Sequence, residues 1–102
     1  MNPRAMNMLG LCARAGKLVT GEKAVVQAIR SGGCYAAVLD GGVAPNGEKA
    51  VTQAAKTHGV PLFKAEAGRL GPSIGRPGRM AAAITDAGMA RRLIELCEVS
   101  EA

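Results

Sequence analysis

The feature that most constrains this fold is the alternation of short apolar runs with helical patterns along the chain. The short runs have the length and the continuous apolar character of strands that are buried on both faces. Between them, apolar residues recur three and four positions apart, as on the buried face of a helix. Strands that alternate with helices predict an α/β fold in which a mainly parallel sheet lies between helical layers.

Capping residues and glycines give approximate boundaries for these elements. Pro3 suits the first turn of a helix, and Thr20, Asn46 and Asp86 are predicted to cap the helices that they precede. The predicted strands are 17–19, 35–39, 60–64 and 80–85, and the predicted helices are 3–14, 21–31, 47–58 and 87–98, with a weaker helical pattern over 68–75. Four short strands with four or five helices make a small three-layer α/β/α sandwich.

Length and composition limit the ways in which such a chain can bind. The 102 residues predict a single domain over residues 1–102, and the 48% of apolar residues are mostly small. The chain has one Phe, one Tyr and no Trp. Stacking of bases on aromatic rings therefore cannot be its main binding mode, which argues against a sheet reader of the RNP type and an oligonucleotide-binding barrel.

The charges are unevenly distributed. The formal net charge is +5, but residues 1–93 carry thirteen Lys and Arg against five Asp and Glu, a net of +8. The acidic end, residues 94–102, carries Glu95, Glu98 and Glu101, and we expect it to fray because acidic residues oppose the dipole at a helix C-terminus. A basic body favours a polyanionic partner, although a merely soluble basic protein has the same net charge.

Cysteine usage and the N-terminus indicate the compartment. Cys12, Cys34 and Cys97 form no C-x-x-C pair, and His58 is the only histidine, so a zinc site would lack ligands. An odd number of cysteines without a secretion signal fits a reducing cytoplasm. The sequence has no stretch that is apolar for long enough to span a membrane. We therefore expect a cytoplasmic protein without a bound metal.

The chain contains no complete nucleotide-binding or catalytic motif. Five residues separate Gly10 from Gly16, where a phosphate loop needs four, and Leu18 stands where that loop has Ser or Thr. The dinucleotide pattern G-x-G-x-x-G is absent. Asp40 and Asp86 lie near predicted strand ends, but a turn residue and a helix cap account for them. We predict neither catalytic residues nor a cofactor.

Basic residues gather at two predicted junctions. Lys17 and Lys23 flank the start of the helix over 21–31, whose free N–H groups and dipole favour an anion. Arg76 and Arg79 flank a Gly-Pro-containing turn before the last strand. An ordinary strand-to-helix turn with solvated lysines is an alternative for the first junction. Periodicity does not show whether the two junctions share one edge of the sheet.

Several segments resemble a known family, in the expected order. The most specific is Leu-Gly-Leu-Cys-Ala-Arg-Ala-Gly-Lys-Leu-Val-Thr-Gly-Glu over residues 9–22. It is followed by Ala-Ile-Arg-Ser-Gly-Gly, Ala-Ala-Val-Leu-Asp, His-Gly-Val-Pro-Leu-Phe, Leu-Gly-Pro-Ser-Ile-Gly-Arg and Ala-Ala-Ile-Thr-Asp. Over residues 6–96 the chain is similar to the bacterial, YlxQ-like branch of the L-seven-Ae ribosomal protein family. The resemblance implies an α/β/α sandwich with a four-stranded mixed sheet, no enzymatic activity and binding to kink-turn RNA.

The resemblance also implies which residues bind RNA. In that family the start of the second helix enters the groove at the kink and reads sheared G·A pairs, and the loop before the last strand covers the extruded nucleotide. The corresponding residues here are Gly21, Glu22, Lys23, Ala24, Gln27, Gly75, Arg76, Pro77, Gly78, Arg79 and Met80. We add Lys17, which lies at the first basic junction, to the predicted RNA-binding residues.

The chain departs from the family pattern within this predicted site. Typical kink-turn binders have Asn and Glu where this chain has Lys23 and Ala24, and Lys where it has Gln27. Their covering loop is largely apolar, whereas this one carries Arg76 and Arg79. These changes move the contacts from base edges towards phosphates, which position an RNA without specifying its sequence.

We therefore predict a non-enzymatic, monomeric RNA-binding protein of the ribosomal type. Its partner is a structured RNA, such as a kink-turn or ribosomal RNA, with the ribosome as a further partner, and we expect no membrane and no small-molecule substrate. The first alternative is a protein-interaction module of the translation or transcription machinery that kept the fold and lost specific RNA reading. The second is a small nucleotide-binding α/β enzyme, which the missing phosphate loop and catalytic residues disfavour.

Overall fold

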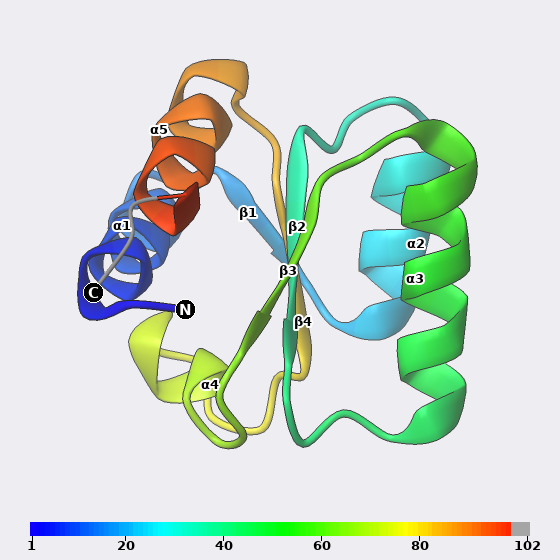
Figure 1. Cartoon of the computed structure of the whole chain (residues 1–102), viewed down its shortest axis with the longest axis horizontal. Helices are drawn as coiled ribbons and strands as arrows, with labels where there is room; N and C mark the ends of the chain where they lie inside the picture. Colours follow the sequence, from blue (N-terminus) through cyan, green and yellow to red (C-terminus); the bar gives the residue numbers. More distant parts are fainter. Residues whose placement is uncertain (99–102) are drawn as a thin grey trace.

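A four-stranded sheet forms the centre of the computed structural model, which describes residues 1–98 (Figure 1). The strands are β1 (Leu18–Thr20), β2 (Ala36–Asp40), β3 (Leu62–Ala65) and β4 (Ala81–Ile84). The helices are α1 (Pro3–Arg14), α2 (Glu22–Arg30), α3 (Pro45–His58), α4 (Leu70–Ser73) and α5 (Ala87–Glu98). Each predicted element is present with small shifts of its boundaries, except that α4 is much shorter than the pattern over 68–75 indicated.

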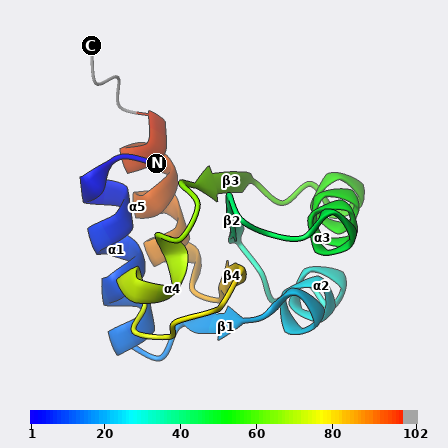
Figure 2. The same cartoon turned by 90° about the horizontal axis from the view of Figure 1, so that it is seen from below.

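The strand order is β1-β4-β2-β3, so the last strand in the sequence lies between β1 and β2 (Figure 2). Strand β4 is antiparallel to both neighbours, and only β2 and β3 are parallel. The mainly parallel sheet predicted from the alternation is therefore wrong, whereas the mixed sheet implied by the family resemblance is confirmed. The reason is that residues 66–80, which connect β3 to β4, stay at one end of the sheet: Ala65 ends β3 beside Asp40, and Ala81 begins β4 beside Leu39.

Two helical layers cover the sheet. Helices α1, α4 and α5 lie on one face, and α2 and α3 lie on the other (Figures 1 and 2). Alternate strand residues face opposite layers: Val38 and Ile84 pack with the first layer, and Leu39 and Ala83 pack with the second. The central strand β4 contains three successive buried alanines, and these small side chains let both layers approach the sheet closely.

The helix starts agree only partly with the predicted caps. Asp86 caps α5 as predicted, because its carboxylate accepts a 2.8 Å hydrogen bond from a backbone N–H of the first turn. Thr20 does not cap α2, because it ends β1, and Gly21 takes the cap position with a φ of 98°. Asn46 does not cap α3 either, since Pro45 at the first helical position starts this helix earlier.

Asp40 ties two loops to the end of β2. Its side chain is fully buried, and it accepts hydrogen bonds from the N–H groups of Gly42 at 2.8 Å, Gly68 at 2.9 Å and Leu70 at 3.0 Å. Burial acts to raise the pKa of this carboxyl, but the backbone N–H groups outweigh it and hold the pKa below its usual value. Asp40 therefore does more than the turn residue that the sequence suggested, because it fixes the segment between β3 and α4.

The acidic end is described only in part. Glu95 forms an ion pair with Arg92 at 3.4 Å, and Glu98 is the last residue of α5. Glu101 and the expected fraying of residues 99–102 lie outside the described residues. Between residues 1 and 98, no helix is both long and apolar enough to cross a membrane.

Candidate functional site

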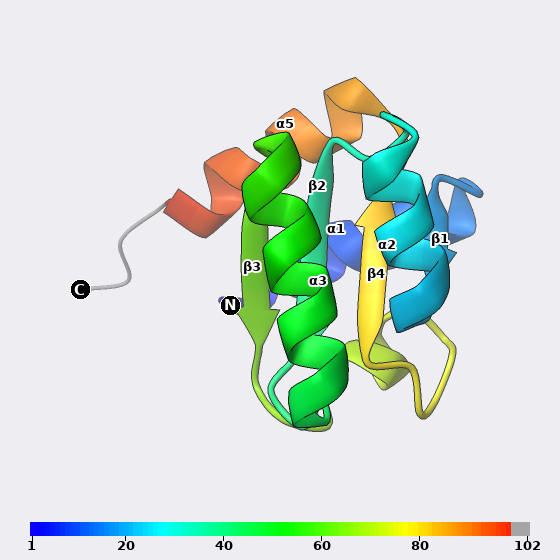
Figure 3. The same ribbon diagram turned by 90° about the vertical axis from the view of Figure 1, so that its right-hand side faces the viewer.

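The antiparallel pairing of β1 with β4 brings the start of α2 and the loop before β4 to one edge of the sheet. Thr20 ends β1 opposite Ala82, and the N–H of Gly21 donates to the carbonyl of Ala81 at 2.9 Å. The start of α2 therefore lies at the same end of the molecule as the loop over residues 75–80 (Figure 3). Periodicity could not predict this neighbourhood, because it depends on the direction of β4.

The first turn of α2 presents backbone donors beside a guanidinium. Gly21 has a positive φ of 98°, which favours glycine, and its carbonyl accepts the first helical hydrogen bond, from Val25 at 2.9 Å. The N–H groups of the residues between them have no partner within the helix. The Nη1 of Arg79 lies 3.4 Å from the position that a Cβ would take at Gly21. A helix N-terminus and a neighbouring cation together favour an anion.

An open groove of about 990 Å³ extends from this edge along α2 to α3, and we term it the α2 groove. Six of the twelve predicted site residues line it: Gly21, Glu22, Lys23, Ala24, Gln27 and Arg79. Ala24 lines this groove and is half-buried, whereas the neighbouring Val25 is fully buried in the core. The apolar pattern of this helix predicts an inner face of Ala24, Val25, Ala28 and Ile29, but only Val25 and Ile29 are fully buried.

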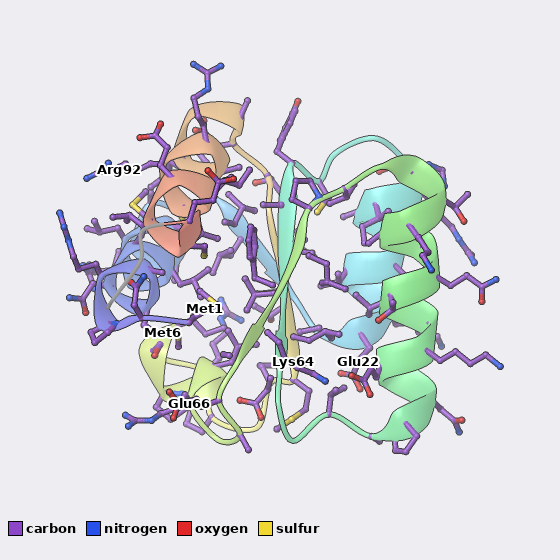
Figure 4. All side chains as sticks on the ribbon, in the orientation of Figure 1. Met1, Met6, Glu22, Lys64, Glu66 and Arg92 are labelled. Atoms are coloured by element: carbon purple, nitrogen blue, oxygen red, sulfur yellow. The ribbon has the colours of Figure 1, made fainter. Side chains whose placement is uncertain are left out.

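Glu22 is the single acidic residue among those that line the α2 groove. A Cβ built at Gly47, in the first turn of α3, would lie 2.9 Å from Glu22 Oε2 and 3.0 Å from Glu22 Cγ. The missing side chain at Gly47 thus leaves room for the carboxylate of Glu22 against α3 (Figure 4). This carboxylate offers hydrogen-bond acceptors in a groove that also carries the cations Lys23 and Arg79.

The other six predicted site residues lie outside the α2 groove: Lys17 and the loop residues Gly75, Arg76, Pro77, Gly78 and Met80. Lys17 is exposed before the other end of β1, where its carbonyl accepts from the N–H of Thr85 at 3.0 Å. Four steps of extended chain separate Lys17 from Gly21, a distance of about 13 Å. Arg76 is exposed in the loop before β4, and Met80 is half-buried against the core beneath α2 and α3.

Sequence reasoning missed six residues that line the α2 groove: Thr20, Val26, Arg30, Asn46, Gly47 and Ala50. Three of them belong to α3. One of these, Ala50, is exposed, although its place in the apolar pattern with Val51, Ala54 and Ala55 predicts an inward position. Strands β1 and β2 point in the same direction because β4 is antiparallel to both. The helices that follow them therefore begin at the same end of the sheet. Strand order is the signal that would have revealed this, and no local pattern contains it.

The α2 groove carries a net positive charge. Lys23, Arg30 and Arg79 are exposed, and none of them takes part in the ion pairs found among the described residues. Against them stands the single carboxylate of Glu22. The part of the chain that the structure describes holds no group of three or more His, Cys, Asp or Glu residues that could bind a metal ion. The arrangement is suited to holding an anion or a polyanion.

The sequence matches a protein-family model over most of its length. The model of the Ribosomal protein L7Ae/L30e/S12e/Gadd45 family matches residues 4–94. The chain is 38% identical over 92 residues to the RNA-binding protein YlxQ of Bacillus subtilis (strain 168), and this match covers 89% of the chain and 92% of that protein. It is 33% identical over 97 residues to the RNA-binding protein YlxQ of Enterococcus faecium, and this match covers 93% of the chain and 92% of that protein.

Solved structures share the fold. A protein of unknown function from Bacillus halodurans has a TM-score of 0.89 and 28% sequence identity, over 96% of this chain and 100% of that one. The 15.5kD RNA binding protein of Giardia lamblia has a TM-score of 0.74 over 96% of this chain and 98% of that one. At 17% identity, the second likeness concerns the fold alone.

Proposed function

The chain belongs to the Ribosomal protein L7Ae/L30e/S12e/Gadd45 family, and from this premise we propose that it is a non-enzymatic RNA-binding protein of the ribosomal type. It acts in the cytoplasm as a single, monomeric domain. The observation that carries the proposal is the α2 groove, where free backbone donors of a helix start meet Lys23 and Arg79. These groups match phosphate, the repeated anionic group of RNA. The names of two relatives, both RNA-binding proteins, support it.

The proposed target is a kink-turn or another folded element of ribosomal RNA, in isolation or on the ribosome. No aromatic residue lines the α2 groove, so unstacked bases have no ring on which to stack. Folded and double-helical RNA is recognised instead by its shape and by contacts to phosphates and 2′-hydroxyls. A groove with exposed cations and backbone donors favours that mode.

Specific reading of bases has one charged acceptor in this groove. Ala24 lines the groove but offers no polar side-chain atom, and Gln27 replaces the lysine of typical kink-turn binders. Glu22, held against α3 at Gly47, is the charged acceptor that remains. We therefore infer that most contacts go to phosphates and that Glu22 supplies what base recognition there is.

Binding to a kink-turn RNA and to the same RNA with its G·A pairs replaced tests the proposal. We expect tighter binding to the intact kink-turn. Lys23→Ala and Arg79→Ala should each weaken this binding and leave the melting temperature nearly unchanged, because both side chains are exposed. Arg4→Ala, at an exposed cation on α1 in the other helical layer, is the matched control and should bind normally. Unchanged affinity in the variant with both substitutions contradicts the assigned site.

A protein-interaction module is the alternative function, and one observation favours it. Three residues that line the α2 groove, Ala24, Val26 and Ala50, are apolar and offer no group that reads a base. If the protein binds neither RNA at low ionic strength, this alternative replaces the RNA-binding proposal.

A further inference from the structure

A second open groove adjoins the α2 groove on the outer face of α2 and α3, and we term it the α3 groove. Its polar lining residues are Arg30, Asn46, Lys49, Gln53, Thr57 and His58. Arg30, Asn46 and Ala50 line both grooves. The two grooves therefore form one continuous surface that begins at the start of α2 and extends to the end of α3.

The α3 groove presents a regular row of hydrogen-bonding side chains. Asn46, Lys49, Gln53 and Thr57 follow one another at intervals of three and four residues, which places them on one face of the helix. All four are exposed. From Asn46 to His58 the row covers about 18 Å of helix axis at about 1.5 Å per residue. A partner of matching length and regular repeat can contact the whole row.

The charge of the α3 groove is positive and uncompensated. No acidic residue lines it, and the single carboxylate of α3, at Glu48, pairs instead with Lys64 of β3. The helix dipole accounts for Arg30 and His58, which lie in the last turns of their helices. It does not account for Lys49, which lies near the start of α3 and has no ion-pair partner among residues 1–98.

We propose that the α3 groove binds the phosphate backbone of an RNA stem that leaves the α2 groove. This inference rests on the proposed function and deepens it, because it assigns a second contact surface to the same RNA. A length of 18 Å corresponds to roughly five base pairs at the strand spacing of a duplex. Lys49 contacts a phosphate, and the neutral side chains Gln53 and Thr57 donate to phosphate or 2′-hydroxyl oxygens. An RNA duplex offers such acceptors at regular intervals, as the row of side chains requires.

The test compares kink-turn RNAs whose two stems are lengthened separately, from about three to about nine base pairs. We expect that lengthening one of the two stems raises the affinity and steepens its dependence on salt, because additional phosphates are contacted. Lys49→Ala should remove this gain and lower the slope of log affinity against log salt by about 1 on the long-stem RNA only. Lys56→Ala is the matched control, because Lys56 is an exposed lysine of the same helix that lines neither groove.

The outcomes separate this inference from the proposed function. If the affinity for kink-turn RNA does not depend on the length of either stem, the α3 groove does not bind a stem. The proposed function is unaffected by that result. An equal loss in Lys49→Ala on short-stem and long-stem RNA also overturns it, since Lys49 would then contact the kink. If the protein binds none of these RNAs, both proposals are wrong. An acidic protein then becomes the expected partner of the α3 groove.

Discussion

Asp40 is a buried carboxylate that holds backbone. Three N–H groups, from Gly42, Gly68 and Leu70, donate to its side chain. Its own N–H donates to the carbonyl of Met80 at 2.8 Å, where the loop of the candidate site enters β4. One residue thus fixes both loops at this end of the sheet. Replacing its side chain leaves buried donors without an acceptor.

We expect Asp40→Asn to lower the free energy of unfolding by about 2–4 kcal/mol, because an amide satisfies fewer of these donors than a carboxylate. The pKa of Asp40 is held below the usual 3.8, so the carboxylate stabilises the folded state fully above that pH. This stabilisation is lost as the pH falls from there through the lower folded-state pKa. Thermal unfolding of both proteins across the acid range checks this. Parallel pH curves for wild type and variant contradict it.

In the proposed site, we expect Glu22 to weaken non-specific binding of RNA and to contribute to specific binding. Glu22→Gln removes a negative charge from the α2 groove and keeps the shape of the side chain. We expect tighter binding to any RNA, but a smaller preference for the kink-turn over the same RNA with its G·A pairs replaced. A good base contact is worth about 1–3 kcal/mol of discrimination in DNA, and we apply that scale here.

Competition binding with both RNAs measures the effect of Glu22→Gln. Glu66→Gln is the matched control, because Glu66 is an exposed glutamate that lines neither groove. If Glu22→Gln keeps the same preference for the kink-turn, Glu22 does not recognise bases.

The short helix α4 supports the loop that carries Arg79. A Cβ built at Gly71 would lie 2.8 Å from the carbonyl oxygen of Arg76, 3.0 Å from the nitrogen of Gly78 and 3.1 Å from the Cα of Pro77. These are backbone atoms, which cannot rotate away. The position of the loop therefore depends on a buried glycine that lines neither groove.

We expect Gly71→Ala to displace this loop and to weaken RNA binding without touching the RNA, with a loss of stability of about 1–3 kcal/mol from overpacking. The control is Gly10→Ala, whose Cβ would meet the backbone oxygen of Ser73 at 3.0 Å between α1 and α4. This variant should lose stability as well but keep its affinity for RNA. Affinity and melting temperature are measured on both, and equal losses of affinity contradict the role of Gly71.

Local patterns predicted the elements well and their arrangement poorly. The helix Pro3–Arg14 and the cap Asp86 follow from signals within a few residues of each element. The direction of β4 does not, because it depends on the end of the sheet at which residues 66–80 lead into β4. Because the direction of β4 is not visible in local patterns, only the family resemblance places Lys23 and Arg79 in one site. The residues that α3 contributes to the α2 groove were missed, because predicting them requires the strand order.

The whole molecule is basic on both of its helical layers. The net charge of +8 over residues 1–93 steers any polyanion towards it. Arg4, Arg91 and Arg92 lie on α1 and α5, on the side away from the two grooves. The strength of specific binding should depend on the layer of α2 and α3 and on the loop before β4, and not on α1 and α5.

The salt dependence of affinity tests this separation. Five cations line the two grooves or lie in the adjoining loop: Lys23, Arg30, Lys49, Arg76 and Arg79. At about 0.7–0.9 per contact, the slope of log affinity against log salt should be about −3.5 to −4.5. Arg91→Ala should leave this slope unchanged. Titrations at several salt concentrations measure it, and a dissociation constant independent of salt contradicts a basic binding face.

The strand order also has a consequence for folding during translation. A nascent chain leaves the ribosome from its N-terminus, yet β1 and β2 are joined only through β4, which follows the other three strands in the sequence. Until Ala81 has emerged, the N–H of Gly21 has no carbonyl to pair with, and Arg79 has only just been added. Contacts so distant in sequence close late. The proposed RNA-binding surface is therefore withheld from the growing chain until β4 has been made.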